Sequence, residues 1–327
     1  MAPPTRVTKG LEKVVVPAAN FGLNFVSSYH PPQIEFRAAR VKEDPAELEK
    51  AAETLKQAGA IVLRGFYSTS QIDRLRGSVE PFFEEAEQWR NADPKHLEDQ
   101  RVLVQNGVRK TLNGYGSILK HPKPVLNFRI DEDAGLVDLF HPERIFEPQG
   151  AIGVADPNKE SLVQTLLERA FSCHFKTSVR NLYLNDSVVR TRGFHIDGLD
   201  MKSKNFLYLT DVGSDEDGPY SYALGTHRAS KRLRAANLRY NASLGRRWDD
   251  FPLHASRRRV VFHGERGDLI ISMQFGAHRG LPQHWNRRRI VLVHTVAEVK
   301  KARAEVAPDG AAPLAVNPQQ DPPSAHA

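Results

Sequence analysis

The chain has 327 residues, of which 40 % are hydrophobic and 26 % charged, so its composition is that of a soluble globular protein with enough length for one elaborated β domain. A single cysteine, Cys173, excludes a disulfide framework within the chain and a thiolate zinc site. The formal net charge of +7 fits an anionic partner or a genome that favours arginine over lysine, and charge alone excludes neither.

The sequence predicts one domain, because it shows neither an internal repeat nor a clear linker. We expect this domain over residues 11–302, with a helical N-terminal part at about 40–175 and a β core at about 178–298. Residues 1–10 and the Pro- and Ala-rich residues 303–327 are expected to be disordered. No apolar run is long enough for a signal peptide or a bilayer span, so we expect a cytoplasmic protein without a membrane partner.

The predicted helices lie in the N-terminal half. The first begins at Asp44-Pro45, an N-cap followed by proline at the first helical position, and ends at Gly59. A buried strand is expected directly after it, at 60–66. The pair Ser68 and Gln71 then forms a capping-box pattern that starts a second helix, and a third is expected over 160–171.

After about residue 178 the pattern changes to short strands that are separated by glycine and proline. Many short strands without intervening helices predict a sandwich or a jelly roll. The strands are expected at 181–189, 204–212, 219–224, 258–264, 268–275 and 289–297.

A pair of metal-ligating residue types, His195 and Asp197, lies within one extended segment. Residues i and i+2 of such a segment point to the same side, so one imidazole and one carboxylate can converge on one point. This pair alone is a common pattern, but His278 follows the strand at 268–275, and a jelly roll brings distant strand ends together at one mouth. Two histidines and one carboxylate form the facial triad of non-haem Fe(II) oxygenases, which leaves positions for a bidentate 2-oxo acid and for O₂.

Arg289, eleven residues after His278, is the candidate that would neutralise the far carboxylate of such a 2-oxo acid, because a guanidinium pairs with both oxygens. Strand parity places Arg287 and Arg289 on one side and Arg288 on the other. We choose Arg289 because it lies deepest in the apolar run, and Arg287 remains the alternative.

The segment from His195 to Arg289 resembles the phytanoyl-CoA dioxygenase family of Fe(II)- and 2-oxoglutarate-dependent oxygenases. The resemblance covers about residues 50–297, with a looser match over 90–175, and includes an upstream strand and helix at 60–76. Thr226 stands where family members often have serine. The matching motifs, in order, are Phe-His-Ile-Asp at 194–197, Leu-Tyr-Leu-Thr-Asp-Val at 207–212, Gly-Pro at 218–219, Gly-Thr-His-Arg at 225–228, Gly-Asp-Leu-Ile at 267–270, His-Arg-Gly at 278–280 and Arg289.

The resemblance implies a mainly β fold with a double-stranded β-helix (jelly roll, cupin-like) core and N-terminal helices packed on it. It implies Fe(II) on His195, Asp197 and His278, with 2-oxoglutarate bound by Arg289 and O₂ as cosubstrates. The expected reaction is hydroxylation of a small-molecule metabolite at a C–H bond, with release of succinate and CO₂. Related halogenases have a small residue at the carboxylate position, so Asp197 indicates hydroxylation or a related oxidation.

Other polar residues of the sequence are candidates for the same site. On the strand at 204–212, one side is expected to face into the barrel, where Lys204 or Thr210 could bond to 2-oxoglutarate. No serine lies in a Gly-x-Ser-x-Gly elbow, which disfavours acyl transfer. Four further histidines are assigned to packing or to the surface: His227, His263, His284 and His294.

The strongly basic segment at 228–259 has two interpretations, a solvated insertion or a lid that attracts an anionic substrate. Two other function classes stay open. A nucleic-acid demethylase on the same fold would suit the net charge, but no basic aromatic stacking platform is evident. A non-catalytic, cupin-like metal-binding protein would keep the histidines but would not need Arg289.

Overall fold

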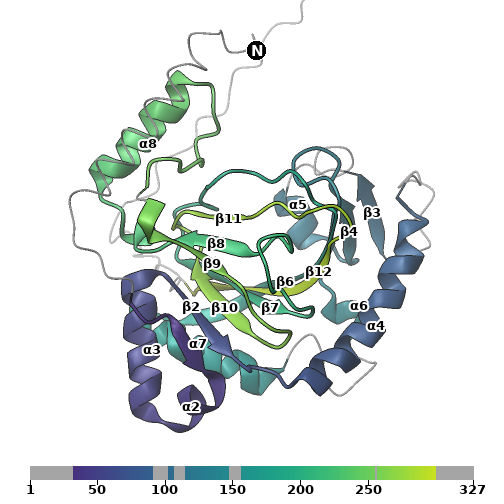
Figure 1. Ribbon diagram of the computed structural model, residues 1–327, viewed down its shortest axis with the longest axis horizontal. Helices are drawn as coiled ribbons and strands as arrows, with labels where there is room; N and C mark the ends of the chain where they lie inside the picture. Colours follow the sequence, from purple (N-terminus) through teal and green to yellow (C-terminus); the bar gives the residue numbers. More distant parts are fainter. Residues whose placement is uncertain (1–31, 91–101, 107–114, 147–155, 255, 300–327) are drawn as a thin grey trace, which may run out of the picture.

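The computed structural model describes residues 32–90, 102–106, 115–146, 156–254 and 256–299. In this part of the chain a nine-stranded sheet packs on one side against a three-stranded sheet and on the other against helices (Figure 1). None of the described helices is long and apolar enough to cross a membrane. The disorder predicted for 1–10 and 303–327 concerns residues outside the described part.

The large sheet is mixed, because β1 pairs with β2 and β3 with β4 in parallel, whereas its other neighbours are antiparallel. The small sheet is entirely antiparallel. The large sheet has the order β1 (Glu35–Arg37), β2 (Ala60–Arg64), β10 (Leu269–Met273), β7 (Lys202–Tyr208), β12 (Arg288–Glu298), β6 (Phe175–Asp186), β5 (Leu136–Phe140), β4 (Val125–Phe128) and β3 (Leu103–Asn106). The small sheet has the order β11 (His278–Gly280), β8 (Tyr220–Ala223) and β9 (Arg259–Phe262).

Alternation along the strands divides the apolar side chains between two cores. On β7, Phe206 and Tyr208 face the small sheet and pack with Tyr220 of β8. The intervening Leu207 faces the helices. We call the side of the large sheet that carries Phe206 its inner face. The register extends this face across the sheet, since Val293 of β12 pairs with Phe206.

The helical layer forms where its local signals place it. Helix α3 (Pro45–Ala58) has Asp44 as its N-cap and ends at Gly59, whose φ of 82° suits glycine. Helix α4 (Thr69–Glu87) begins with the expected capping box of Ser68 and Gln71. The remaining helices are α2 (Ala38–Glu43), α5 (Tyr115–Lys120), α6 (Glu143–Phe146), α7 (Pro157–Phe171) and α8 (Lys231–Ser243), with 3₁₀ turns at η3 (Thr226–Arg228) and η4 (Ser256–Arg258).

Several elements of the structure are not predicted by the sequence patterns, among them three strands of the large sheet and one helix. Strands β3, β4 and β5 extend the large sheet within the region expected to be mainly helical. They are four or five residues long, and β4 and β5 are buried on both sides, so they show no alternation. Helix α8 lies in the basic segment and buries only Asn237 and Asn241, so it has no apolar stripe.

Candidate metal centre

Two backbone hydrogen bonds hold His195 beside His278. The N–H of each residue donates to the carbonyl of the other, at 3.0 and 2.9 Å, so the segment around His195 pairs with the start of β11. The two imidazole centroids are 4.6 Å apart. Asp197 is held in the same way, because its N–H donates to the carbonyl of Gln274 just after β10.

The three side chains converge on one point. One carboxylate oxygen of Asp197, Oδ1, lies 3.7 Å from Nε2 of His195 and 3.6 Å from Nε2 of His278. The ligand atoms of the three residues all lie within 4.8 Å of one another. Among the described residues this is the one cluster of three or more His, Cys, Asp or Glu side chains that can hold a metal ion.

Hydrogen bonds fix the tautomer of both histidines. Nδ1 of His195 lies 2.9 Å from the carbonyl oxygen of Gly193, and Nδ1 of His278 lies 2.9 Å from that of Gly276. A carbonyl oxygen only accepts, so each Nδ1 carries the hydrogen and each Nε2 keeps its lone pair. Both lone pairs are therefore available at the point where the carboxylate lies, as metal ligation requires.

The protonation states of the ligand residues suit metal ligation. Burial, together with neighbouring His278, lowers the pKa of His195 to about 3, so this imidazole is neutral at physiological pH. Burial by itself would raise the pKa of Asp197, but the charge of Lys204 and the contacts with both imidazoles hold it well below its usual value. The site thus presents one anion and a neutral imidazole at neutral pH.

Two lysines bond to Asp197 without blocking the oxygen that faces the histidines. The Nζ of Lys204, on the inner face of β7, lies 2.6 Å from Oδ2. The Nζ of Lys202 donates instead to the main-chain carbonyl of Asp197, at 2.8 Å. Oδ1 remains directed at the imidazoles, so the carboxylate is arranged to bind a metal through one oxygen. The sequence singled out Lys204 only as a cosubstrate contact, because its distance from Asp197 depends on the fold.

The structure separates the three neighbouring arginines. Arg289, on the inner face of β12, is 9 % exposed, and its Nε has no hydrogen-bond partner among the described residues. Arg287 is exposed and forms an ion pair with Glu216 at 2.8 Å. Arg288 is also exposed. Burial lowers the pKa of Arg289, against the opposing effects of Tyr208 and Asp217.

Aromatic rings connect Arg289 with the metal ligands. The ring of Tyr220 lies 5.8 Å from that of His278. The N–H of Tyr220 donates to the hydroxyl of Tyr208, at 3.4 Å, and Tyr208 in turn influences the pKa of Arg289. The buried guanidinium and the three ligands therefore lie along one aromatic-lined stretch of the space between the sheets.

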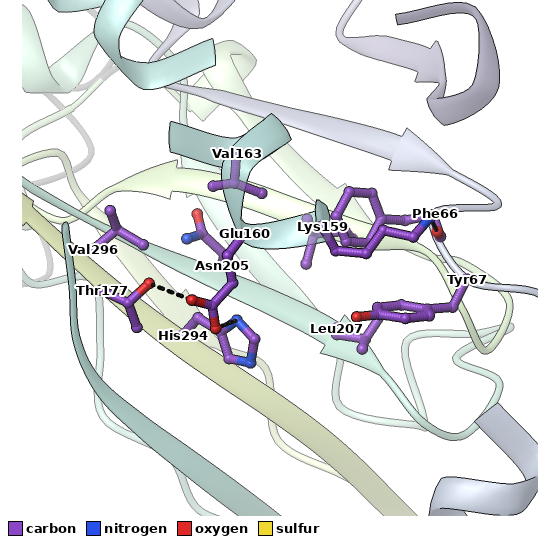
Figure 2. Close-up of a pocket in the computed structure, with 11 residues that line it drawn as sticks. Phe66, Tyr67, Lys159, Glu160, Val163, Thr177, Asn205, Leu207, His294 and Val296 are labelled. Atoms are coloured by element: carbon purple, nitrogen blue, oxygen red, sulfur yellow. Dashed lines mark hydrogen bonds and ion pairs between the residues drawn. The ribbon is translucent and has the colours of Figure 1, made fainter. Parts of the chain in front are cut away.

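The histidines that the sequence set aside take other roles. His227 is buried and lies 2.9 Å from the carbonyl of Lys56 through Nε2, whereas His263 is partly exposed and His284 is exposed. His294 lies on the opposite face of the large sheet, beneath α7, where Figure 2 shows it beside Glu160 at a cavity of about 20 Å³. That volume suits one water molecule and not a substrate.

The basic segment supports the ligand-bearing loop. Arg192, three residues before His195, forms ion pairs with Asp249 and Asp250, each at 2.6 Å. Asn241 of α8 donates to the carbonyl of Asp250 at 2.7 Å, and the N–H of Ile196 donates to the carbonyl of Asp249 at 2.9 Å. The insertion is thus bonded to the segment that presents His195 and Asp197. The lid interpretation remains a prediction.

Comparison with models of protein families finds no match, and comparison with curated proteins finds none either, so the resemblance to the phytanoyl-CoA dioxygenase family is not confirmed. Among solved structures, the chain is similar to EvdO2 from Micromonospora carbonacea var. aurantiaca, with a TM-score of 0.50 and 14 % identity over 79 % of this chain and 94 % of that one. This likeness shows a shared fold.

Two further solved structures match with lower scores. One is the non-haem α-ketoglutarate-dependent carbocyclase SnoK from nogalamycin biosynthesis, with a TM-score of 0.47 and 14 % identity over 76 % of this chain and 83 % of that one. The other is HygX from Streptomyces hygroscopicus with nickel, 2-oxoglutarate and hygromycin B bound, with a TM-score of 0.42 and 14 % identity over 77 % and 90 %.

Proposed function

We propose that this chain is an Fe(II)- and 2-oxoglutarate-dependent oxygenase with a double-stranded β-helix core, acting on a small-molecule metabolite. The observation that carries the proposal is the convergence of two Nε2 lone pairs and one carboxylate oxygen, from His195, His278 and Asp197. Two histidines and one carboxylate on one side of an ion are the ligand set of this enzyme class.

Arg289 is the residue that we assign to the cosubstrate. A buried guanidinium without a carboxylate partner among the described residues suits the far carboxylate of 2-oxoglutarate. Asn185 of β6 pairs with Arg289 in the register, and its buried Oδ1 has no hydrogen-bond partner in the described ranges. Thr210 accepts a hydrogen bond from the N–H of Ile290 and keeps its own hydroxyl hydrogen to donate. Lys204 is bonded to Asp197, which leaves Thr210 as the candidate on this strand for a contact with the cosubstrate.

When bound, the metal with 2-oxoglutarate and O₂ would supply the oxidation of a substrate C–H bond, with release of succinate and CO₂. The protein positions these groups and excludes water. Phe206 and Tyr220 stack at 4.4 Å between the sheets and provide apolar walls. Asp197 fills the ligand position that a halogenase leaves for chloride, so we propose hydroxylation or a related oxidation.

Metal binding provides the direct test. Wild-type protein should bind one Fe(II) under anaerobic conditions and develop a weak visible absorption band when 2-oxoglutarate is added. His195→Ala and His278→Ala should each lose the band and most of the affinity for Ni(II) measured by calorimetry. His263→Ala is the control, because this partly exposed imidazole lies away from the three ligands and bonds to Asp215. Full metal binding by either ligand variant would refute the assignment.

Release of succinate distinguishes the oxygenase from a cupin-like metal-binding protein. With Fe(II), 2-oxoglutarate and O₂, the wild-type protein should form succinate slowly without a substrate and faster with one. A protein that binds Fe(II) but neither binds 2-oxoglutarate nor forms succinate would be a metal-binding protein only.

A further inference from the structure

A row of polar side chains crosses the inner face of the large sheet on strands β3 to β6. Gln105 of β3 pairs with Asn127 of β4, and Asn127 pairs with Asp138 of β5. Asn181 of β6 lies next to them, with its Nδ2 2.8 Å from Oδ1 of Asp138. We call these four residues the carboxamide row. All four are buried, with exposures between 0 and 2 %.

Two members of the row are unpartnered. Both side-chain polar atoms of Gln105 and both of Asn127 are inaccessible to solvent and have no hydrogen-bond partner within the described part of the chain. Asp138, by contrast, bonds to Asn181 and lies 3.5 Å from Nη2 of Arg129. A buried amide that forms no hydrogen bond carries a desolvation cost, so native proteins rarely keep two such groups side by side without a purpose.

The row lies on the same face as the residues of the proposed site. Asp138 pairs with Tyr183 of β6, Tyr183 with Val291 of β12, and Val291 with Tyr208 of β7. Burial raises the pKa of Asp138 to about 6, against the opposing charge of Arg129, the hydrogen bond from Asn181 and the charge of Lys204. Lys204 thus acts electrostatically on Asp138 while bonded to Asp197.

We propose that Gln105 and Asn127 bind hydroxyl groups of the primary substrate, which is accordingly a hydroxyl-rich compound of the sugar or cyclitol type. This inference rests on the proposed oxygenase function. A carboxamide offers two donor hydrogens and one acceptor oxygen, and a hydroxyl group likewise both donates and accepts. The carboxylate of Asp138 in the same row disfavours an anionic group there. An apolar substrate would leave both carboxamides without partners.

The unliganded protein gives a first test that needs no substrate. Asn127→Leu and Gln105→Met replace unpartnered amides by apolar groups of similar shape, so the melting temperature should stay the same or rise by about 2 °C. Asn181→Leu is the contrast, because it removes the partner of buried Asp138 and should lower the melting temperature. A fall in the Asn127→Leu and Gln105→Met variants as large as that in Asn181→Leu would show that the two carboxamides are structural and would overturn the inference.

A second test uses defined probes. Myo-inositol and methyl α-D-glucopyranoside represent hydroxyl-rich compounds, and decanoate represents an apolar chain. The hydroxyl-rich probes should accelerate succinate release by the wild-type protein, and Asn127→Leu should need about tenfold or more probe for half-maximal acceleration. Asn205→Leu is the matched control, since Asn205 is equally buried but faces α7 on the opposite side of the sheet (Figure 2).

The outcomes separate this inference from the proposed function. Both Asn127→Leu and Asn205→Leu should bind Fe(II) and 2-oxoglutarate as the wild-type protein does. If the wild-type protein fails to bind them, the proposed function is wrong and the inference falls with it. If it binds them but responds to decanoate alone, to none of the probes, or equally in Asn127→Leu, the inference is wrong and the proposed function stands.

Discussion

Asp197 divides its two carboxylate oxygens between different neighbours. Oδ1 faces the two imidazoles, and Oδ2 bonds to the ammonium group of Lys204. In the metal-free protein Lys204 is therefore the cation that balances this carboxylate. A bound metal ion would add a second cation on the opposite oxygen. The stabilisation that the metal provides should therefore depend on whether Lys204 is present.

Lys204→Met should lower the melting temperature of the metal-free protein, because it leaves the Asp197 carboxylate without its counter-charge. Added Ni(II) should then raise the melting temperature by more in this variant than in the wild-type protein. Lys202→Met is the control, since Lys202 bonds to the main chain of Asp197. An equal metal-induced shift in all three proteins would contradict the role given to Lys204.

Arg289→Leu should weaken 2-oxoglutarate binding about a hundredfold or more while leaving Fe(II) binding nearly unchanged. Loss of one partner of a buried charge pair costs on the order of 3–5 kcal/mol. Titration of the iron-loaded protein with 2-oxoglutarate measures the effect. Arg287→Leu serves as the control because Arg287 is exposed and pairs with Glu216. A large loss in Arg287→Leu alone would transfer the assignment to that residue.

At the scale of elements, β11 presents His278 on a tightly packed turn. A Cβ atom added to Gly276 would lie 1.9 Å from the hydroxyl oxygen of Tyr222, which is fully buried. The carbonyl of Gly276 also orients the imidazole of His278. Only glycine fits at position 276, because any Cβ atom there would overlap Tyr222. The packing of this turn therefore also sets the orientation of the His278 imidazole.

Gly276→Ala should destabilise the protein by about 1–3 kcal/mol, as overpacking of a core does. It should also weaken Ni(II) binding, because the turn must shift and His278 shifts with it. Gly280→Ala at the end of β11 is the control, since a Cβ there would meet nothing within 4 Å. Unchanged unfolding and metal binding in Gly276→Ala would contradict this account of the turn.

The elements that the sequence predicts are those with strong local signals. Asp44 caps α3, and Ser68 with Gln71 caps α4, where the capping patterns predict them. Strands β3 to β5 show no alternation, because their burial depends on neighbours far along the chain. Helix α8 has an N-cap in Ser230 but no apolar stripe, so its periodicity does not predict a helix. The structure brings His195, Asp197 and His278 together, and this convergence is predicted by the order of the motifs from 194 to 289, because the His-x-Asp pair alone is common. The contacts of Lys204 and the carboxamide row depend on strand register, which no local pattern specifies.

At the scale of the whole molecule, burial keeps several histidines neutral. Burial lowers the pKa of both His227 and His254 to about 4, from an ordinary value of 6.5. His227 faces the charges of Arg228 and Arg234, and His254 faces that of Arg259, which also disfavour protonation. Neither residue belongs to the proposed metal site.

The free energy of unfolding should therefore fall as the pH decreases from about 6.5 towards 4. In this interval the unfolded chain takes up protons on both histidines and the folded chain does not. The stability is therefore full above pH 6.5, and each histidine lowers the free energy of unfolding by up to about 3 kcal/mol as the pH falls to 4. Urea unfolding at a series of pH values measures this slope. His254→Gln should make the slope shallower, and an identical slope in the variant would contradict the prediction.

The pairing of His195 with His278 joins segments that are 83 residues apart, and β6 pairs with β12, the first and last strands of the β core. Contacts between such distant segments form slowly, because the chain must close a long loop before they can stabilise it. The three ligands can come together only once β11 has docked against the segment that carries His195 and Asp197. Metal capture should accordingly be one of the last events of folding, and an ion added at the start of refolding should leave the folding rate unchanged while slowing unfolding.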